Sequence, residues 1–342
     1  RDLRMSRGLG DVYKRQTYYS NICPNGAYQG YGAPKGNFAI TMALAELAEQ
    51  LQIDQLEIIE RNRVHEGQEL KILGAIGEGK APTSVPSAAS CALEEILRQG
   101  REMIQWSSPK PQNGDWHIGR GVAIIMQKSG IPDIDQANCM IKLESDGTFI
   151  VHSGGADIGT GLDTVVTKLA AEVLHCPPQD VHVISGDTDH ALFDKGAYAS
   201  SGTCFSGNAA RLAAENLREK ILFHGAQMLG EPVADVQLAT PGVVRGKKGE
   251  VSFGEIAHKG ETGTGFGSLV GTGSYITPDF AFPYGANFAE VAVNTRTGEI
   301  RLDKFYALLD CGTPVNPELA LGQIYGATLR AIGHSMSEAV SY

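Results

Sequence analysis

The chain has 342 residues, of which 42% are hydrophobic and 20% are charged, and its formal net charge is -10. This length is enough for about two domains, and the composition is that of a globular protein with a substantial core. The negative balance argues against a nucleic-acid partner, because such proteins present basic patches to phosphates. No apolar run reaches the roughly 18 residues needed to cross a bilayer, and no signal peptide is visible. We therefore expect a soluble, cytoplasmic protein without a nucleic-acid or membrane partner.

The two ends of the sequence look unlike the rest. Residues 1–16 carry five basic side chains, show no helical or strand period and do not begin with methionine. We treat them as a non-native tail and leave them out of the fold. The last predicted helix runs into Ser341-Tyr342 without a cap, so the chain is expected to be a fragment.

Helices dominate the first third of the chain. Apolar residues recur with a helical period, and Asp54 with Glu57 has the form of a capping box. The predicted helices are Asn37–Leu51, Asp54 to about Val64, and Ser87 or Ser90 to Trp106. The segment Pro109–Asp115 is the best linker, so we predict one domain over residues 17–108 and a second over residues 116–342.

Beyond the linker the pattern changes to strands joined by glycine-containing turns. The predicted strands are Gly121–Met126, Cys139–Leu143, Thr148–His152, Val181–Ser185, Phe288–Asn294 and Glu299–Leu309. The predicted helices are Leu162–Leu174, Asn208–Phe223 and Leu319–Ile332. Two units of hairpin, glycine loop and helix indicate an internal duplication in an α+β fold.

Three glycine-rich turns lead into helices, at Gly26–Gly32, Gly154–Gly161 and Gly196–Gly202. Glycine lets a backbone approach a ligand closely, and a helix start offers unpaired N–H donors to an anion. Each turn alone is explained by ordinary turns and helix caps. Together, and with the hydroxyls of Thr160, Ser200 and nearby residues, they favour one large phosphate-bearing ligand.

The second turn also imitates a dinucleotide-binding unit, with Gly159-x-Gly161, a helix, a strand and then Asp187. Thr164 stands where a third glycine belongs, and the strand before the turn is half polar. A nicotinamide-dependent dehydrogenase remains the alternative. The loop Asp187–His190 also resembles a metal loop, although such carboxylates more often cap their own backbone.

Cysteine and histidine spacing gives no metal site. The six cysteines are far apart without a C-x-x-C pair, and the nine histidines lack ligand spacing. The cysteines are predicted to be buried free thiols, and no residue is predicted to ligate a metal directly.

The turns, in this order, resemble the molybdenum-binding subunit of the xanthine dehydrogenase/aldehyde oxidase family of molybdenum hydroxylases. The segment from Gly26 to Pro34 resembles the family's G-A-F-R-G-F-G-x-P-Q, and Gly154–Leu162 resembles G-G-x-E-M-G-Q-G-L. Further likenesses are Gly186-Asp-Thr188, Tyr198–Ser201, Ser206–Ala209, and Asp310-x-Gly312 with Asn316-Pro317 and Gly322-Gln323. The resemblance spans Thr17 to about Glu338 and implies molybdopterin-binding domains of the xanthine dehydrogenase type.

The resemblance implies a molybdenum–molybdopterin cofactor, in bacteria usually in its cytosine dinucleotide form. Cofactor contacts carried over by motif are Ala27, Tyr28, Gly30, Arg61, Gly159, Thr160, Gly161, Ala199, Ser200 and Ser201. Of these, Gly159 and Thr160 would touch the pterin, and residues 199–201 would flank the dithiolene. Thr160 and Ser201 replace the family's Gln and Arg, so these contacts differ in detail.

The family hydroxylates an electron-poor carbon next to nitrogen, with water as the oxygen source and a glutamate as general base. Electrons leave through iron–sulfur centres, and in some members FAD, on other domains or subunits. Gln29 stands where purine-oxidising members carry Arg, so a neutral amide replaces a cation at the predicted substrate-binding position. The resemblance therefore implies a purine or related heterocycle, such as hypoxanthine.

The family segment that holds the catalytic glutamate is absent from this sequence, so no catalytic residue is predicted within it. We expect the chain alone to be inactive. A cofactor-free binding or assembly module remains a further hypothesis, beside the dehydrogenase.

Overall fold

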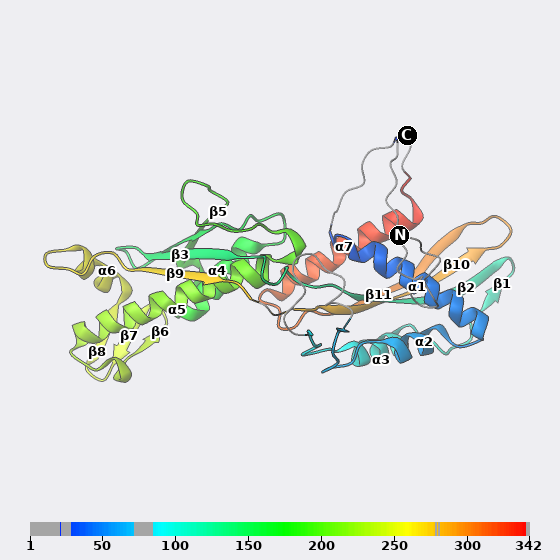
Figure 1. Cartoon of the computed structure of the whole chain (residues 1–342), viewed down its shortest axis with the longest axis horizontal. Coiled ribbons are helices and arrows are strands. Elements are labelled where there is room, and N and C mark those ends of the chain that lie inside the picture. Colours follow the sequence, from blue (N-terminus) through cyan, green and yellow to red (C-terminus); the bar gives the residue numbers. More distant parts are fainter. Residues whose placement is uncertain (1–20, 22–28, 72–84, 278, 280, 340–342) are drawn as a thin grey trace, which may run out of the picture.

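The computed structural model describes residue 21 and residues 29–71, 85–277, 279 and 281–339. The molecule is elongated, with one half built around β3, β4, β5 and β9 and the other around β2, β10 and β11 (Figure 1). Within the described residues, no helix is both long and apolar enough to span a membrane. Mixed helices and strands confirm the predicted α+β class.

The first half holds a mixed sheet in the order β5-β4-β3-β9, in which only β4 and β5 are parallel. Its strands are β3 (Ala137–Leu143), β4 (Phe149–Ser153), β5 (Val181–Ser185) and β9 (Val270–Tyr275). Helices α4 (Leu162–Leu174) and α5 (Gly202–Leu229) bury one face of this sheet in the largest core. Alternate residues of β3 are fully buried there, as expected for a sheet covered on one face.

A small sheet and a short helix extend the tip of this half (Figure 1). They are β6 (Gln237–Ala239), β7 (Val243–Gly246), β8 (Gly249–Ser252) and α6 (Phe253–Glu261). A reciprocal capping box starts α6, since the Ser252 hydroxyl accepts from the Glu255 N–H and the Glu255 carboxylate accepts from the Ser252 N–H.

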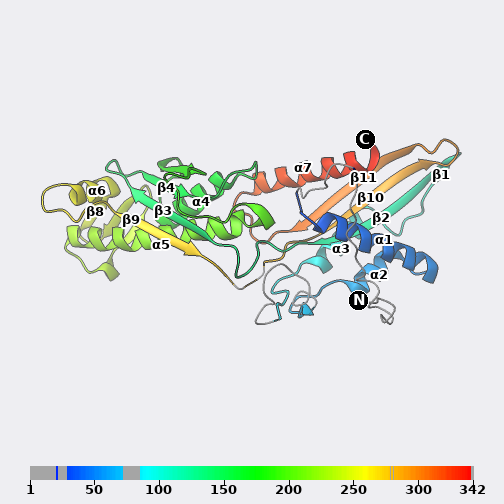
Figure 2. The ribbon, with the colours of Figure 1, turned by 45° about the horizontal axis from the view of Figure 1, so that its top comes forward.

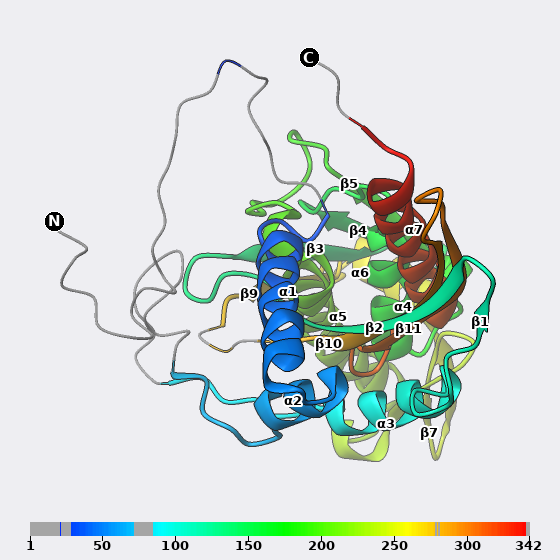
Figure 3. The same ribbon diagram turned by 90° about the vertical axis from the view of Figure 1, so that its right-hand side faces the viewer.

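The second half holds an antiparallel sheet in the order β1-β2-β10-β11. Its strands are β1 (Gln112–Asn113), β2 (Trp116–Met126), β10 (Tyr284–Asn294) and β11 (Ile300–Asp310). Helices α1 (Ala33–Leu51), α2 (Gln55–Asn62) and α3 (Leu93–Met103) pack on the face that carries Val122, Ala286 and Phe288. Helix α7 (Pro317–Met336) lies on the opposite side of this sheet (Figures 2 and 3).

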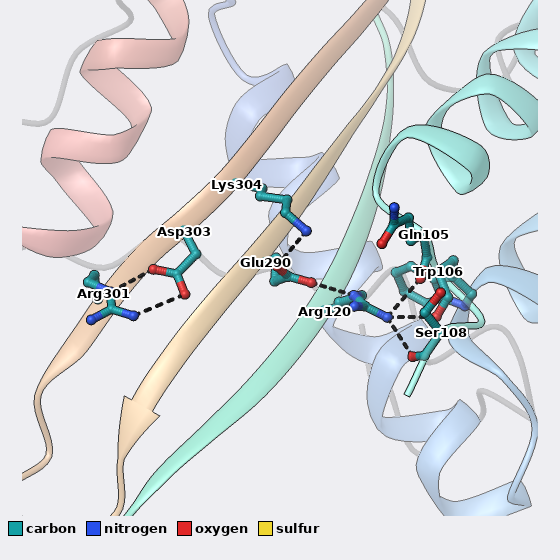
Figure 4. Close-up of polar contacts among 8 residues, drawn as sticks. All are labelled: Gln105, Trp106, Ser108, Arg120, Glu290, Arg301, Asp303 and Lys304. Carbon is teal, nitrogen blue, oxygen red and sulfur yellow. Dashed lines mark hydrogen bonds and ion pairs between the residues drawn. The ribbon is translucent and has the colours of Figure 1, made fainter. Parts of the chain in front are cut away.

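A buried ion pair fastens the α-helical layer to this sheet. Arg120 on β2 donates from Nε to Glu290 on β10 over 2.6 Å, and Lys304 on β11 pairs with the same carboxylate over 2.9 Å (Figure 4). The Arg120 side chain is only 4% exposed, and its Nη1 donates to the carbonyl oxygens of Gln105 and Ser108. The three strands and the turn after α3 are thereby tied at one point.

Several element boundaries match their sequence signals. Helix α4 and strand β5 have the predicted limits, and Asp54 caps α2 by accepting from the N–H of Leu56 over 2.9 Å. The predicted serine caps of α3 are wrong. Its N-cap is Ala92, whose N–H donates to the Asp310 carboxylate over 3.1 Å. A residue distant in sequence therefore supplies that cap.

The two predicted hairpin–loop–helix units are present as β3-β4-α4 and β10-β11-α7. In each unit a further antiparallel strand flanks the first hairpin strand, β9 beside β3 and β2 beside β10. The domain division at Pro109–Asp115 stays a prediction. Packing joins the chain on its two sides, because α1, α2 and α3 share a core with β2 and β10.

Candidate functional site

A cavity of about 570 Å³ lies beside the start of α7 and receives residues from both halves of the molecule. Thr160 lines it from the second glycine turn, and Ser200 lines it from the third. Polar neighbours in its wall are Thr203, Asp310, Thr313, Asn316 and Gln323. The structure therefore brings two of the three predicted turns to one place.

The first glycine turn is not part of this cavity in the described structure. Gln29 is exposed, Gly30 turns with φ +91°, and Ala27 and Tyr28 lie outside the described residues. Arg61 stands at the end of α2, where it pairs with Glu57 and lines a separate open pocket. The predicted roles of these residues stay predictions.

In the second turn, a carboxylate from the turn itself occupies the backbone donors. Asp157 Oδ1 accepts hydrogen bonds from the N–H of Gly159 over 2.9 Å and of Gly161 over 3.1 Å. Partial burial opposes ionisation of Asp157, but these N–H groups outweigh it and hold the pKa of the carboxyl below its ordinary value. The start of α4 is therefore not the open anion site that glycine spacing predicts. No atom of the residues that the structure describes lies within 4 Å of a Cβ added at Gly159.

The third turn is strained and held from several sides. Ala199 and Ser200 both adopt left-handed backbone, with φ of +54° and +60°, which is unfavourable for residues other than glycine. The N–H of Gly130 donates to the Ala199 carbonyl over 2.7 Å. The Ser201 hydroxyl, 3% exposed, donates towards the carbonyls of Gly196 and Tyr198. The Ser201 side chain thus closes the turn, and Ser200 is the residue of this turn that lines the cavity.

One carboxylate joins the third turn to the start of α5. Asp194 accepts from the Gly196 N–H and from the Ser206 hydroxyl, each over 2.8 Å. The second turn packs against this pair so closely that a Cβ at Gly154 would lie 2.6 Å from Asp194 Cβ, and one at Gly155 would lie 2.9 Å from Ser206 Oγ. Both glycines are therefore needed for packing, and the two turns form one unit.

The N-terminus of α5 supplies the open donors of the cavity. Its N-cap residue, Ser201, makes no side-chain cap bond. No described residue accepts a hydrogen bond from the N–H groups of Gly202, Thr203 or Cys204, and the last two residues line the cavity. A helix of 28 residues thus presents its positive end there, which favours a negatively charged ligand group.

Helix α7 reaches across to the second turn. Gln323 Nε2 donates to the Gly159 carbonyl over 3.1 Å. Leu319 packs so closely that a Cβ at Gly161 would lie 2.6 Å from its Cδ1. The start of α7 itself is capped by Asn316, which accepts from the Leu319 N–H. Residues 159–161 are therefore fixed both from within, by Asp157, and from α7.

The cavity is also lined by a buried tyrosine, Tyr284. Tyr284, a cavity residue that is 1% exposed, has no hydrogen-bond partner for its hydroxyl among the described residues. Burial, together with nearby Cys91 and Asp310, raises the pKa of Tyr284 to about 12. Asp310 accepts from the N–H groups of Ala92 and Gly312, so its carboxylate is engaged in holding backbone.

The loop Asp187–His190 bonds to itself. Asp187 accepts from the Asp189 N–H over 2.9 Å and contacts His190 Nδ1 over 3.0 Å. These bonds hold the pKa of Asp187 below its ordinary value. The described residues contain no group of three or more His, Cys, Asp or Glu side chains able to hold a metal ion. The loop therefore follows the self-capping interpretation.

The described cysteines are free, but they are not uniformly buried. Burial raises the pKa of Cys139 and of Cys176 to about 12, so these thiols are unreactive near neutral pH. Cys91 and Cys204 are half-buried, and Cys311 is exposed beside the cavity. The prediction of buried thiols is correct for two positions and wrong for Cys311, while Cys23 lies outside the described residues.

The donor set of the cavity fits a pterin bearing phosphate. Its lining contains hydroxyls, amides, the open N–H groups of α5 and no described lysine or arginine. Its one described carboxylate, Asp310, accepts hydrogen bonds from the N–H groups of Ala92 and Gly312. Such a site binds negative charge through backbone and dipoles, with apolar contacts for a ring system. Thr160, which directly follows Gly159, and Ser200 bring the two turns to its edge with only small hydroxyl side chains. The residues present therefore fit a molybdopterin-type group.

Comparisons with known proteins point the same way. A molybdopterin cofactor-binding domain model matches residues 99–342, and a second model of that description matches residues 12–63. The chain is 99% identical over 326 residues to a probable hypoxanthine oxidase of Escherichia coli (strain K12), covering 95% of this chain and 34% of that protein. It is 32% identical to a xanthine dehydrogenase molybdenum-binding subunit of E. coli O157:H7, covering 96% of this chain and 44% of that protein.

Solved structures show the same fold. Quinoline 2-oxidoreductase from Pseudomonas putida 86 superimposes with a TM-score of 0.71 at 26% identity, covering 94% of this chain and 43% of that chain. CO dehydrogenase from Oligotropha carboxidovorans superimposes with a TM-score of 0.77 at 21% identity, covering 92% and 41%. The chain thus spans about a third of its E. coli relative and less than half of these structures.

The nicotinamide alternative is not supported. A parallel β4-α4-β5 unit does exist, but its turn amides are occupied by Asp157, and the relatives are molybdenum hydroxylases. The cavity that joins the glycine turns, the open end of α5 and the family match over residues 99–342 agree. This chain belongs to the molybdopterin cofactor-binding domain family of the molybdenum hydroxylases.

Proposed function

We propose that this chain is the cofactor-cradling part of a molybdenum hydroxylase that oxidises a purine or related N-heterocycle, with hypoxanthine as the first candidate. The observation that carries the proposal is the convergence of Thr160, Ser200 and the open N–H groups of α5 in one cavity free of described lysine and arginine. The substrate class follows from the relative that is 99% identical and is named a probable hypoxanthine oxidase.

In this proposal the chain's own residues hold the cofactor rather than perform the chemistry. The N–H groups of Thr203 and Cys204 would bind its negative charge, and Gly159 and Ala199 would bring backbone against its ring system. The resemblance assigns the same neighbourhood to Thr160, Gly161, Ser200 and Ser201. The structure refines one of these roles, because the Ser201 hydroxyl is engaged within its own turn.

When bound, the molybdenum centre would supply transfer of a water oxygen to the substrate carbon and would accept two electrons. For each C–H converted to C–OH, two protons and two electrons leave, so electron carriers are needed. We propose iron–sulfur domains or subunits, with or without FAD, for that step. We also propose the cytosine dinucleotide form of the cofactor and a cytoplasmic location.

Gln29 is the proposed substrate-binding residue. It is exposed in the described structure, so the substrate pocket would be completed by the rest of the longer polypeptide. An amide stabilises a developing oxyanion less than a guanidinium does, and it imposes less preference for an anionic purine. Hypoxanthine or another neutral heterocycle is therefore favoured over xanthine.

The direct test is turnover by the full-length protein with hypoxanthine and with xanthine, using a dye as electron acceptor. We expect hypoxanthine to be oxidised with the higher kcat/KM, and the Gln29→Arg variant to shift the ratio towards xanthine. Absence of turnover with any purine in molybdenum-loaded protein would overturn the substrate proposal. Turnover by the 342-residue chain alone would overturn the proposal that the catalytic base lies elsewhere.

A further inference from the structure

The sheet of the first half shows how a long helix seats on this architecture. Helix α5 lies over β9, where a Cβ at Gly271 would be 2.3 Å from the Ala213 carbonyl oxygen and one at Gly273 would be 2.3 Å from the Ala209 carbonyl oxygen. The two glycines are separated by one residue and lie on the covered face of β9, so the backbone of α5 can touch the strand. The strand, the glycine pair and α5 form one packing unit.

The second half has the same glycine pair, and no helix of the described part of the chain covers it. Strand β2 occupies the place that β9 has in the first half, and it carries Gly119-x-Gly121. Both glycines alternate with Val122, so they lie on the sheet face opposite the α1–α3 layer. Among the described residues, a Cβ at Gly121 would meet no atom within 4 Å, and one at Gly119 would meet only Val291, its neighbour in the sheet. This face of β2 is open.

Helix α7 also lacks a packing partner on one side among the described residues. Its counterpart α4 buries six residues, because α5 packs beside it. None of the 20 residues of α7 is buried, although every one of them is described. Leu321, Tyr325 and Leu329 recur every four residues along one side of α7 and are 45%, 60% and 69% exposed. Helix α7, which carries this stripe, lies on the side of the sheet away from α1–α3, and this is the side that Gly119 and Gly121 face (Figure 2).

We propose that a helix from the remainder of the longer polypeptide packs on Gly119 and Gly121, beside the Leu321–Leu329 stripe of α7, as α5 packs on β9 beside α4. The required length exists, because this chain makes up 34% of the 99% identical relative. The partner is expected to present small residues to β2, as α5 presents Ala209 and Ala213 to β9, and apolar residues to α7. The proposal is independent of substrate and cofactor.

This docking would have a consequence for the cavity. Helix α7 contributes Leu319 and Gln323 to the second turn, yet it makes few contacts of its own with the sheet. A helix packed on its outer side would hold α7 down and so fix the Gln323 bond to the Gly159 carbonyl. Assembly of the longer polypeptide and the geometry of the turn would then be linked.

Oxidative footprinting of the native full-length protein is the first test. After correction for the intrinsic reactivity of each side-chain type, Tyr325 and Leu329 should be modified several-fold more slowly than Phe223 and Met228, which are 49% and 40% exposed on α5 and serve as internal references. Equal modification of the two sets would overturn the proposal. Protection that disappears on dilution would also overturn it, because a second copy would then be the cover.

A size series at Gly121 in the full-length protein is the second test. The variants Gly121→Ser, Gly121→Val and Gly121→Leu should lower Tm progressively, with the Leu variant lower by about 5 °C or more, because each adds bulk under the docked helix. Strand propensity alone predicts the opposite order, since Val stabilises an open strand position relative to Gly. An unchanged or raised Tm for Gly121→Val would therefore contradict the docking.

Discussion

The Ser206 hydroxyl donates a hydrogen bond to Asp194 Oδ2 over 2.8 Å, and this bond joins the start of α5 to the third glycine turn. The other oxygen of Asp194 accepts from the Gly196 N–H. Because Ala199 and Ser200 hold unfavourable left-handed backbone, their conformation depends on such anchors. The open donors of α5 and the strained turn are therefore positioned together.

Replacing Asp194 tests this anchor. Asp194→Ala would leave the Gly196 N–H and the Ser206 hydroxyl without their acceptor, so we expect a stability loss of about 1–3 kcal/mol and faster loss of cofactor from the full-length protein. The measurements are denaturant unfolding and molybdenum retained after dialysis. Asp194→Asn is the matched control, because its amide can accept from Gly196 and donate to Ser206 Oγ. Equal loss in both variants would contradict the anchoring role.

Asp157 predicts a pH dependence of the second turn. Its pKa is lowered in the folded chain, so its contribution is present above the unfolded value of about 4 and is lost as pH falls through the lower folded value. The difference in Tm between the wild type and Asp157→Asn should be constant from about pH 5 to about pH 8 and should shrink below about pH 4. A difference that grows on acidification would show that Asp157 does not cap these amides.

Tyr284 predicts an effect at alkaline pH. Burial disfavours the phenolate and raises its pKa to about 12 in the folded chain, so ionisation of Tyr284 leaves stability unchanged below about pH 10 and lowers it as pH rises from about 10 towards 12. Tyr284→Phe should lack this loss, and at pH 7 cofactor-free protein should be as stable or up to about 1–2 kcal/mol more stable, because an unpartnered hydroxyl is removed. Thermal unfolding from pH 7 to 11 measures both. Marked destabilisation at pH 7 would mean that the hydroxyl has a partner.

The Arg120–Glu290 pair predicts a large stability effect far from the cavity. Glu290→Gln should cost about 3 kcal/mol, because it leaves the buried Arg120 without its countercharge (Figure 4). The exposed pair Arg301–Asp303 in the same sheet is the matched control, and Arg301→Gln should change unfolding little. If the two substitutions lower the free energy of unfolding in urea by similar amounts, the stabilising role of the Arg120–Glu290 pair is refuted.

The elements that the sequence predicted well have local signals. The limits of α4 follow from an unbroken apolar period after Gly161, and β5 follows from its apolar run. Strand β9 was missed, because Gly271 and Gly273 interrupt its pattern and its partner β3 is distant. Helix α5 begins earlier than its apolar period predicts, since Gly202 is not an obvious helix start.

The candidate site was predicted only in part, and for physical reasons. Glycine spacing located the second and third turns, which do meet in one cavity. Spacing could not show that Asp157 occupies the amides of its own turn, although an Asp two residues before a glycine is a known turn signal. The roles of Asp194 and Gln323 depend on tertiary contacts and left no local pattern.

The central claim is that this chain cradles a molybdenum pterin dinucleotide through the backbone of its glycine turns and the start of α5. The most direct measurement is the molar content of molybdenum, and of the nucleotide released by acid, in the purified full-length protein. We predict molybdenum and CMP, each in a ratio to protein approaching one, and a lower ratio in the Asp194→Ala variant. Protein that is folded but contains NAD(H), or neither molybdenum nor CMP, would contradict the account.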